Sequence, residues 1–267
     1  MVFYLQKTHR HDYMTNKILI GKSYWNKIAS GYSKTGGAKW IRHPWAVKLA
    51  GNVKNKKVLE LGCGSGVIIN KLVEGGAIGT GADYSDKMLE IAGANAKKSK
   101  LNTKFLLLDV KDLSRLYRKK FDLIIISTVL TTFPSIDDLT KVLSEANKVL
   151  KSTGFMIIVE PHPAFDHYMR TSFINLTSLQ GMNYQAKGKG YVFDMADGEG
   201  NQVESIIYHW RFEDYATAIY RSGLYIERMF EPSPLEIAKS EDPKWYKDRS
   251  RYASYIFFRL KRRQLID

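Results

Sequence analysis

The sequence predicts an α/β protein with a mostly parallel seven-stranded sheet and helices on both of its faces. Three observations support this prediction. Strands and helical patterns alternate from residue 55 to residue 160, the strands of this stretch are apolar throughout, and the helical patterns are mostly about 10–15 residues long. Strands that are apolar on both faces are typical of a parallel sheet that is covered on both sides and joined by right-handed crossovers.

The expected elements of this stretch follow one another in a regular order. Strands are expected at 55–61, 77–83, 103–109, 121–127 and 154–160. Helices are expected at 67–74, 87–98 and 136–150, where apolar residues recur with helical spacing. An amphipathic helix at 21–32, rich in Tyr and Trp, is expected ahead of the first strand.

After Pro161 the alternation breaks. Residues 162–179 are aromatic and are expected to be helical, and strands at 190–195 and 202–208 flank an Asp-Gly-Glu-Gly turn, which predicts a β-hairpin. We interpret this helix-plus-hairpin as an insertion after the fifth strand. The core then resumes with the elements that complete the sheet: a helix at 212–222, a strand at 224–230, a loop, and a last strand at 252–260.

The composition describes a folded, basic protein. The 267 residues include 41 Lys and Arg against 27 Asp and Glu, a formal charge of +14. The apolar runs are far shorter than the about 20 residues that span a bilayer, and the first residues carry charges where a secretory signal is apolar. One cysteine, Cys63, excludes a disulfide within the chain. These features predict a cytoplasmic protein that does not enter a membrane.

The basic residues are scattered over segments that resemble solvated helix faces and loops. This distribution favours a solvating role for the charge. Nucleic-acid binding remains an alternative, because clustered Lys and Arg release counterions from phosphates. A basic surface is equally compatible with an acidic small substrate.

The strongest local signal is the segment VLELGCGSG at 58–66. A strand that runs directly into Gly62, Gly64 and Gly66 lets the backbone approach a ligand closely, and the following helix offers free N–H groups at its start. Asp83 stands at the end of the next strand, where an acidic side chain binds the two hydroxyls of a ribose. The alternating glycines do not match the G-x-G-x-x-G pattern of a dinucleotide fold.

With these residues the sequence resembles the class I S-adenosylmethionine-dependent methyltransferases, specifically the methyltransferase type 11 group that acts on small molecules. The resemblance runs from about Tyr24 to Leu260. Five segments carry it, namely VLELGCGSG, GADYSDKMLEIA, LLLDV, FDLIIISTVLTTF and VLKSTGFMIIVEP. It implies a Rossmann-like fold with S-adenosyl-L-methionine as cofactor and S-adenosyl-L-homocysteine as product. It also implies four segments: an N-terminal helical segment (1–45), a cofactor-binding core (46–163), an inserted acceptor-binding cap (164–210) and a return to the core (211–267).

The resemblance also assigns cofactor contacts. Glu60 and the loop of Gly62, Cys63, Gly64 and Gly66 would face the methionine part, and Asp83 would accept hydrogen bonds from the ribose. Tyr84 or Met88 would pack on the adenine, and Asp109 would accept from the adenine amino group, with the Val110 backbone beside it. Ser127 would line the methionyl side, and Thr131 would lie near the transferring methyl. Tyr24 and Tyr32 would close over the cofactor. No metal site is expected, since no cluster with ligand-like spacing follows the fourth strand.

A general base is needed only if the acceptor must lose a proton. His209, where the insertion returns to the core, is the preferred candidate, followed by His162 and then His43. The aromatic insertion would supply an apolar acceptor pocket. The expected function is methyl transfer to oxygen, nitrogen or carbon of a small organic molecule by a monomer or homodimer. An RNA or tRNA methyltransferase and a non-catalytic cofactor-binding protein remain the alternatives.

Overall fold

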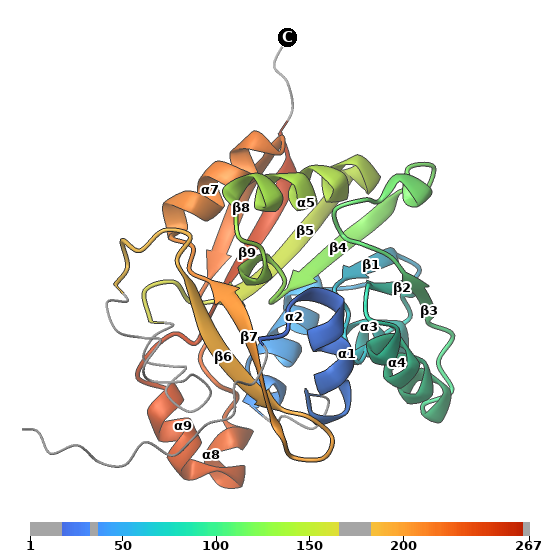
Figure 1. Cartoon of the computed structure of the whole chain (residues 1–267). Helices are drawn as coiled ribbons and strands as arrows, with labels where there is room; N and C mark the ends of the chain where they lie inside the picture. Colours follow the sequence, from blue (N-terminus) through green and yellow to red (C-terminus); the bar gives the residue numbers. More distant parts are fainter. Residues whose placement is uncertain (1–17, 33–36, 166–182, 264–267) are drawn as a thin grey trace, which may run out of the picture.

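The computed structural model describes residues 18–32, 37–165 and 183–263. Its main sheet has seven strands in the order β3-β2-β1-β4-β5-β9-β8 (Figure 1). The strands are β1 (Lys57–Leu61), β2 (Ile78–Asp83), β3 (Lys104–Leu107), β4 (Phe121–Ser127), β5 (Leu150–Pro161), β8 (Leu224–Phe230) and β9 (Tyr255–Arg262). Every pair from β3 to β5 is parallel, and β9 is antiparallel to both of its neighbours. The predicted mostly parallel seven-stranded sheet is confirmed.

Helices cover both faces of this sheet. Alternate residues of the central strands point to opposite faces, so that Leu59 and Ile124 belong to one core and Val58 and Leu123 to the other. The first core is covered by α5 (Ile136–Val149) and α7 (Phe212–Arg221), and the second by α2 (Arg42–Ala50) and α3 (Val67–Glu74). Next to α3 lies α4 (Asp86–Lys98), which begins at an N-cap made by Ser85.

The hairpin forms a second, two-stranded sheet of β6 (Gly190–Ala196) and β7 (Gln202–Tyr208). It lies alongside α1 (Gly21–Tyr32), as Figure 1 shows, and the backbone N–H of Leu19 donates to the Glu204 carbonyl at 3.0 Å. Lys27 pairs with the buried carboxylate of Asp197 at 3.0 Å. The hairpin prediction is confirmed, whereas residues 166–179 of the expected helix lie outside the described residues.

Two parts of the chain differ from the expectation. The segment expected as a loop between the last two strands contains α8 (Ile237–Glu241) and α9 (Pro243–Arg249). Asp242 caps α9 by accepting from the Trp245 N–H at 2.9 Å, and Pro243 occupies the first turn, so an Asp-Pro start signal was present in the sequence. In addition, α2 was not among the elements expected from the sequence.

Short 3₁₀ turns complete the described chain, namely η1 (Gly37–Trp40), η2 (Ser114–Leu116) and η3 (Leu130–Thr132). The last of these directly follows β4 and lies against β7. Within the described ranges, no helix has the length and apolar character that crossing a bilayer requires.

Candidate active site

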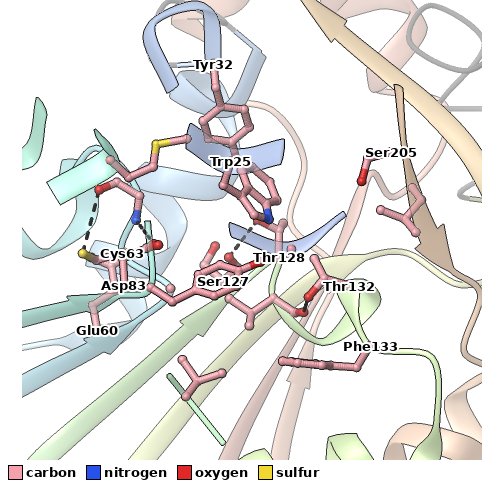
Figure 2. A pocket seen from close by; sticks show the side chains of 18 of the residues that line it. Trp25, Tyr32, Glu60, Cys63, Asp83, Ser127, Thr128, Thr132, Phe133 and Ser205 are labelled. Atoms are coloured by element: carbon pink, nitrogen blue, oxygen red, sulfur yellow. Dashed lines mark hydrogen bonds between the residues drawn. The ribbon is translucent and has the colours of Figure 1, made fainter. Parts of the chain in front are cut away.

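A pocket with a volume of about 420 Å³ opens at the carboxyl ends of β1, β2 and β4. The glycine loop forms its floor, while α1, α2, η3 and the hairpin contribute the remaining walls. Figure 2 shows the carboxyl groups of Glu60 and Asp83 on one side of this space and Trp25, Phe133 and Ser205 around the other. The carboxyl edge of a parallel sheet is where such folds bind their ligands.

The glycine loop has a backbone that only glycine adopts readily. Gly62, Gly64 and Gly66 have φ values of 66°, 51° and 77°, in the left-handed region. A Cβ on Gly62 would lie 2.4 Å from Cγ2 of Val129, which real structures do not tolerate. A Cβ on Gly64 would lie 4.0 Å from the Met88 sulfur, so the space beside Gly64 is open and belongs to the pocket.

Asp83 is held at the end of β2 by backbone donors. Its Oδ2 accepts from the Gly64 N–H and its Oδ1 from the Ser85 N–H, both at 2.9 Å. Burial raises the pKa of this carboxyl, and these hydrogen bonds act in the opposite direction. The Tyr84 N–H is a third backbone donor to this carboxyl. Because a carboxylate has about four acceptor positions, Asp83 retains capacity for a hydroxyl donor from a ligand.

Glu60 lies deeper, at the end of β1. Its Oε2 accepts from the Ile69 N–H at 2.9 Å, and burial raises the pKa of the carboxyl to about 8, although the nearby charge of Arg42 acts to lower it. The carboxyl is therefore mostly protonated at neutral pH. A cationic ligand group placed beside it would favour the charged form.

A buried arginine forms a part of the pocket that sequence reasoning missed. Arg42 is 9% exposed, and its Nη2 donates to the Tyr32 hydroxyl at 3.0 Å and to Nε2 of His43 at 3.2 Å. Its Nη1 donates to Oγ1 of Thr128, whereas its buried Nε has no hydrogen-bond partner among the described residues. In the sequence, this arginine has no motif around it. Its place in the pocket depends on how α2 packs on the sheet.

His43 lines the same part of the pocket. Burial, together with the adjacent Arg42 charge, lowers the pKa of His43 to about 3. Since Arg42 can only donate, Nε2 of His43 is the acceptor and carries no proton. His43 is thus a neutral imidazole at physiological pH and a weak base.

The side of the pocket facing away from the glycine loop is largely apolar. Its walls are side chains of α1, the segment after β4 and the hairpin, namely Trp25, Phe133, Pro134, Phe193, Ile206, Ile207 and Tyr208. Hydroxyl groups interrupt this surface. Ser205 is among them, and the buried Oγ of Ser127 has no hydrogen-bond partner in the described part of the chain. Such a wall suits a largely apolar ligand with a few polar atoms.

Most of the predicted cofactor residues meet in this pocket. Those that line it are Tyr32, Glu60, Gly62, Cys63, Gly64, Asp83, Tyr84, Met88, Asp109, Val110 and Ser127. Three others lie behind the wall. Tyr24 is buried against Phe193, and the centroids of the two rings are 5.6 Å apart. Gly66 is the N-cap of α3. Thr131 forms a hydrogen bond with the buried Glu160.

Neither preferred histidine lines the pocket. Nε2 of His209 donates to the Tyr184 carbonyl at 3.0 Å, and Nε2 of His162 donates to Oε1 of Glu231 at 2.6 Å. Nδ1 of His162 accepts from the Ala164 N–H at 3.3 Å, so both of its ring nitrogens are engaged. In the structure, neither of these two histidines therefore reaches the pocket. Of the three candidates, His43 is the one that the structure brings to the pocket.

Comparison with known proteins identifies the family. The family described as a methyltransferase domain matches residues 52–208, which is more than half of the chain. This chain belongs to the methyltransferase family. The match includes the glycine loop, Asp83 and the hairpin, and it confirms the resemblance seen in the sequence. The seven-stranded sheet with helices on both faces is a Rossmann-like methyltransferase fold.

Named relatives and solved structures agree with this membership. A ubiquinone biosynthesis O-methyltransferase of Pelagibacter ubique is 31% identical over 44% of this chain and 47% of its own length. The methyltransferase thus matches about half the length of that relative. A putative S-adenosylmethionine-dependent methyltransferase of Listeria monocytogenes has a TM-score of 0.64 at 22% identity, covering 86% of this chain and 100% of that one. The magnesium protoporphyrin IX methyltransferase of Synechocystis PCC 6803, solved with S-adenosylhomocysteine, has a TM-score of 0.59 at 18% identity, with 91% and 97% covered.

Proposed function

We propose that this methyltransferase transfers a methyl group to a small, largely apolar organic acceptor with an ionisable hydroxyl. The proposal rests on the observation that the pocket has two different parts. The part at the sheet is lined by carboxyl groups and the glycine loop, whereas the part beneath α1 and the hairpin is lined by aromatic side chains and hydroxyl groups. The methyltransferases of Pelagibacter ubique and Synechocystis bear names of small-molecule enzymes, which supports this acceptor class. The inserted segment 164–210 then acts as the acceptor-binding cap through its hairpin.

The residues at the sheet fit S-adenosylmethionine. Asp83 has capacity for a hydroxyl of the ribose, and the open space beside Gly64 admits the ligand close to the backbone. Tyr84, Met88, Asp109 and Val110 would surround the adenine. Glu60 and Arg42 together suit the amino acid part of the cofactor. The carboxyl of Glu60 suits the ammonium group of the ligand, and the Arg42 guanidinium, whose Nε has no partner among the described residues, suits the carboxylate of the ligand.

The bound cofactor supplies an electrophilic methyl group on a sulfonium. The chain aligns the acceptor with that methyl and excludes water through the aromatic walls formed by α1, η3 and the hairpin. His43 contributes little as a base, because its pKa is about 3. We therefore expect an acceptor that ionises readily by itself, such as an acidic phenol.

The proposal is tested with a panel of phenols and catechols, using release of S-adenosylhomocysteine as the readout. We expect turnover with members of this panel that rises with the acidity of the hydroxyl, and none with the Gly64→Val variant. The same assay is run with RNA as acceptor. Turnover confined to RNA, or to amines, contradicts the proposal.

A further inference from the structure

Thr128 has a backbone conformation that its residue type disfavours. Its φ is +56°, in the left-handed region, where a β-branched side chain is a clear outlier. The other described non-glycine residues with positive φ are Asn55 and Lys100, both in exposed turns. Thr128 instead follows β4 directly and lines the pocket. Strained residues of this kind persist where the surroundings hold them, and they gather at functional sites.

The neighbouring strand holds Thr128 in place. Its N–H donates to the Val159 carbonyl at 2.7 Å, continuing the pairing of β4 with β5. The next two N–H groups, of Val129 and Leu130, donate to Oε1 of the buried Glu160 at 3.1 and 2.8 Å. Consequently, the turn after β4 is fixed by three hydrogen bonds to the end of β5.

The strained backbone directs the Thr128 hydroxyl at Arg42. The hydroxyl donates to the Ser127 carbonyl at 2.7 Å, which leaves its oxygen as the acceptor for Nη1 of Arg42. Tyr32 and His43 accept from Nη2. All three partners are neutral acceptors, and within the described residues no carboxylate is ion-paired with Arg42. The guanidinium is thus held in a fixed plane, while its charge remains available to an anion from the ligand.

We propose that Thr128 is a positioning residue, which uses its strained backbone to fix Arg42 for the carboxylate of the methionyl part of the cofactor. This inference rests on the role of Arg42 in the proposed function. It predicts that Thr128 strengthens binding of ligands that carry this carboxylate and of no others. A merely structural role would affect all ligands alike.

Two probes separate these roles. S-adenosylhomocysteine contains the amino acid part, whereas 5′-methylthioadenosine keeps the adenosyl thioether and lacks that part. We expect Thr128→Gly to weaken S-adenosylhomocysteine about tenfold to a hundredfold, the range for a hydrogen bond to a charged group, and to leave methylthioadenosine unchanged in calorimetric titrations. Its melting temperature should not fall, because glycine tolerates a φ of +56°. Thr128→Ser, which keeps the hydroxyl, should bind both ligands as the wild type does.

Two further variants complete the test. Lys100→Gly makes the same backbone change at a φ of +55° in an exposed turn and should alter neither affinity. Arg42→Met should weaken S-adenosylhomocysteine selectively, and adding Thr128→Gly to it should have no further effect. Equal loss of both ligands in Thr128→Gly, or wild-type affinity for both, would overturn the inference. If Arg42→Met also leaves S-adenosylhomocysteine binding unchanged, the assignment of Arg42 itself fails; if it weakens binding while Thr128→Gly does not, only the role of Thr128 fails.

Discussion

Cofactor binding should release a proton from Glu60. Burial raises the pKa of this carboxyl to about 8 in the ligand-free protein, so it is about nine-tenths protonated at pH 7. If the ammonium group of the ligand lies beside Glu60, the charged form becomes favoured and the pKa returns towards its ordinary value. Binding of S-adenosylhomocysteine at pH 7 is then expected to release about 0.9 protons from this group.

The size of the resulting pH dependence follows from the linkage between proton release and ligand binding. Between about pH 5 and pH 8, the dissociation constant should fall about tenfold for each unit of pH and then level off. Calorimetric titration in phosphate and in Tris, which differ in ionisation enthalpy, counts the protons directly. Glu60→Gln keeps an acceptor for the Ile69 N–H and should remove both the proton release and the slope. Glu74→Gln, on the exposed side of α3, serves as the control and should retain both.

The same carboxyl affects the stability of the ligand-free protein. Because its folded pKa lies above its unfolded value, its contribution is fully present below about pH 4.5 and is lost as the pH rises through about 8. The free energy of unfolding of the wild type, relative to Glu60→Gln, should fall across this range by up to about 5 kcal/mol. Equal proton release by wild type and Glu60→Gln, or a pH-independent affinity, would refute the placement of Glu60 beside the ammonium group.

Three further variants test other parts of the pocket. Asp83→Ala should weaken S-adenosylhomocysteine about 30- to 150-fold in a folded protein, because the charge-assisted hydrogen bonding to the ribose is lost; unchanged affinity would exclude that contact. Gly64→Val should abolish binding, since its side chain would occupy ligand space and its φ of 51° is strained for valine; retained affinity would show that the ligand avoids the loop. His209→Ala should lower the melting temperature while leaving kcat with the acceptor within about threefold of wild type, whereas a loss of 10²-fold or more would restore His209 as the base.

The sheet was predictable because its signals are local. Apolar strands such as β4 and amphipathic helices such as α5 are determined by residues within one element, and the glycine loop with Asp83 spans two adjacent strands. The resemblance could then predict which of these residues contact the cofactor, and most of them line the pocket. In contrast, the short helix α2 carries Pro44 and only a weak amphipathic pattern, so Arg42 gave no signal.

The direction of a side chain is a tertiary property, and this explains the remaining differences. His209 stands at the return of the insertion, as its sequence position implies, yet its ring turns to the Tyr184 carbonyl and not to the pocket. The positive φ of Thr128 is equally invisible in the sequence, because threonine rarely adopts it. It arises from the way β5 holds the turn after β4.

The two walls that enclose the proposed acceptor space, α1 and the hairpin, are joined to each other. A Cβ on Gly31 would lie 2.0 Å from the Ala196 carbonyl oxygen, so the end of α1 approaches the hairpin as closely as the chain permits. The pair of Lys27 with Asp197 joins the same two elements. Trp25 on α1 and Phe193 on β6 both line the pocket, and both pack around Tyr24. The spacing of the acceptor walls is therefore set by contacts between α1 and the hairpin, whereas the cofactor end is set by the sheet. Changes in the contacts between α1 and the hairpin can therefore alter which acceptor fits without disturbing the geometry of the glycine loop.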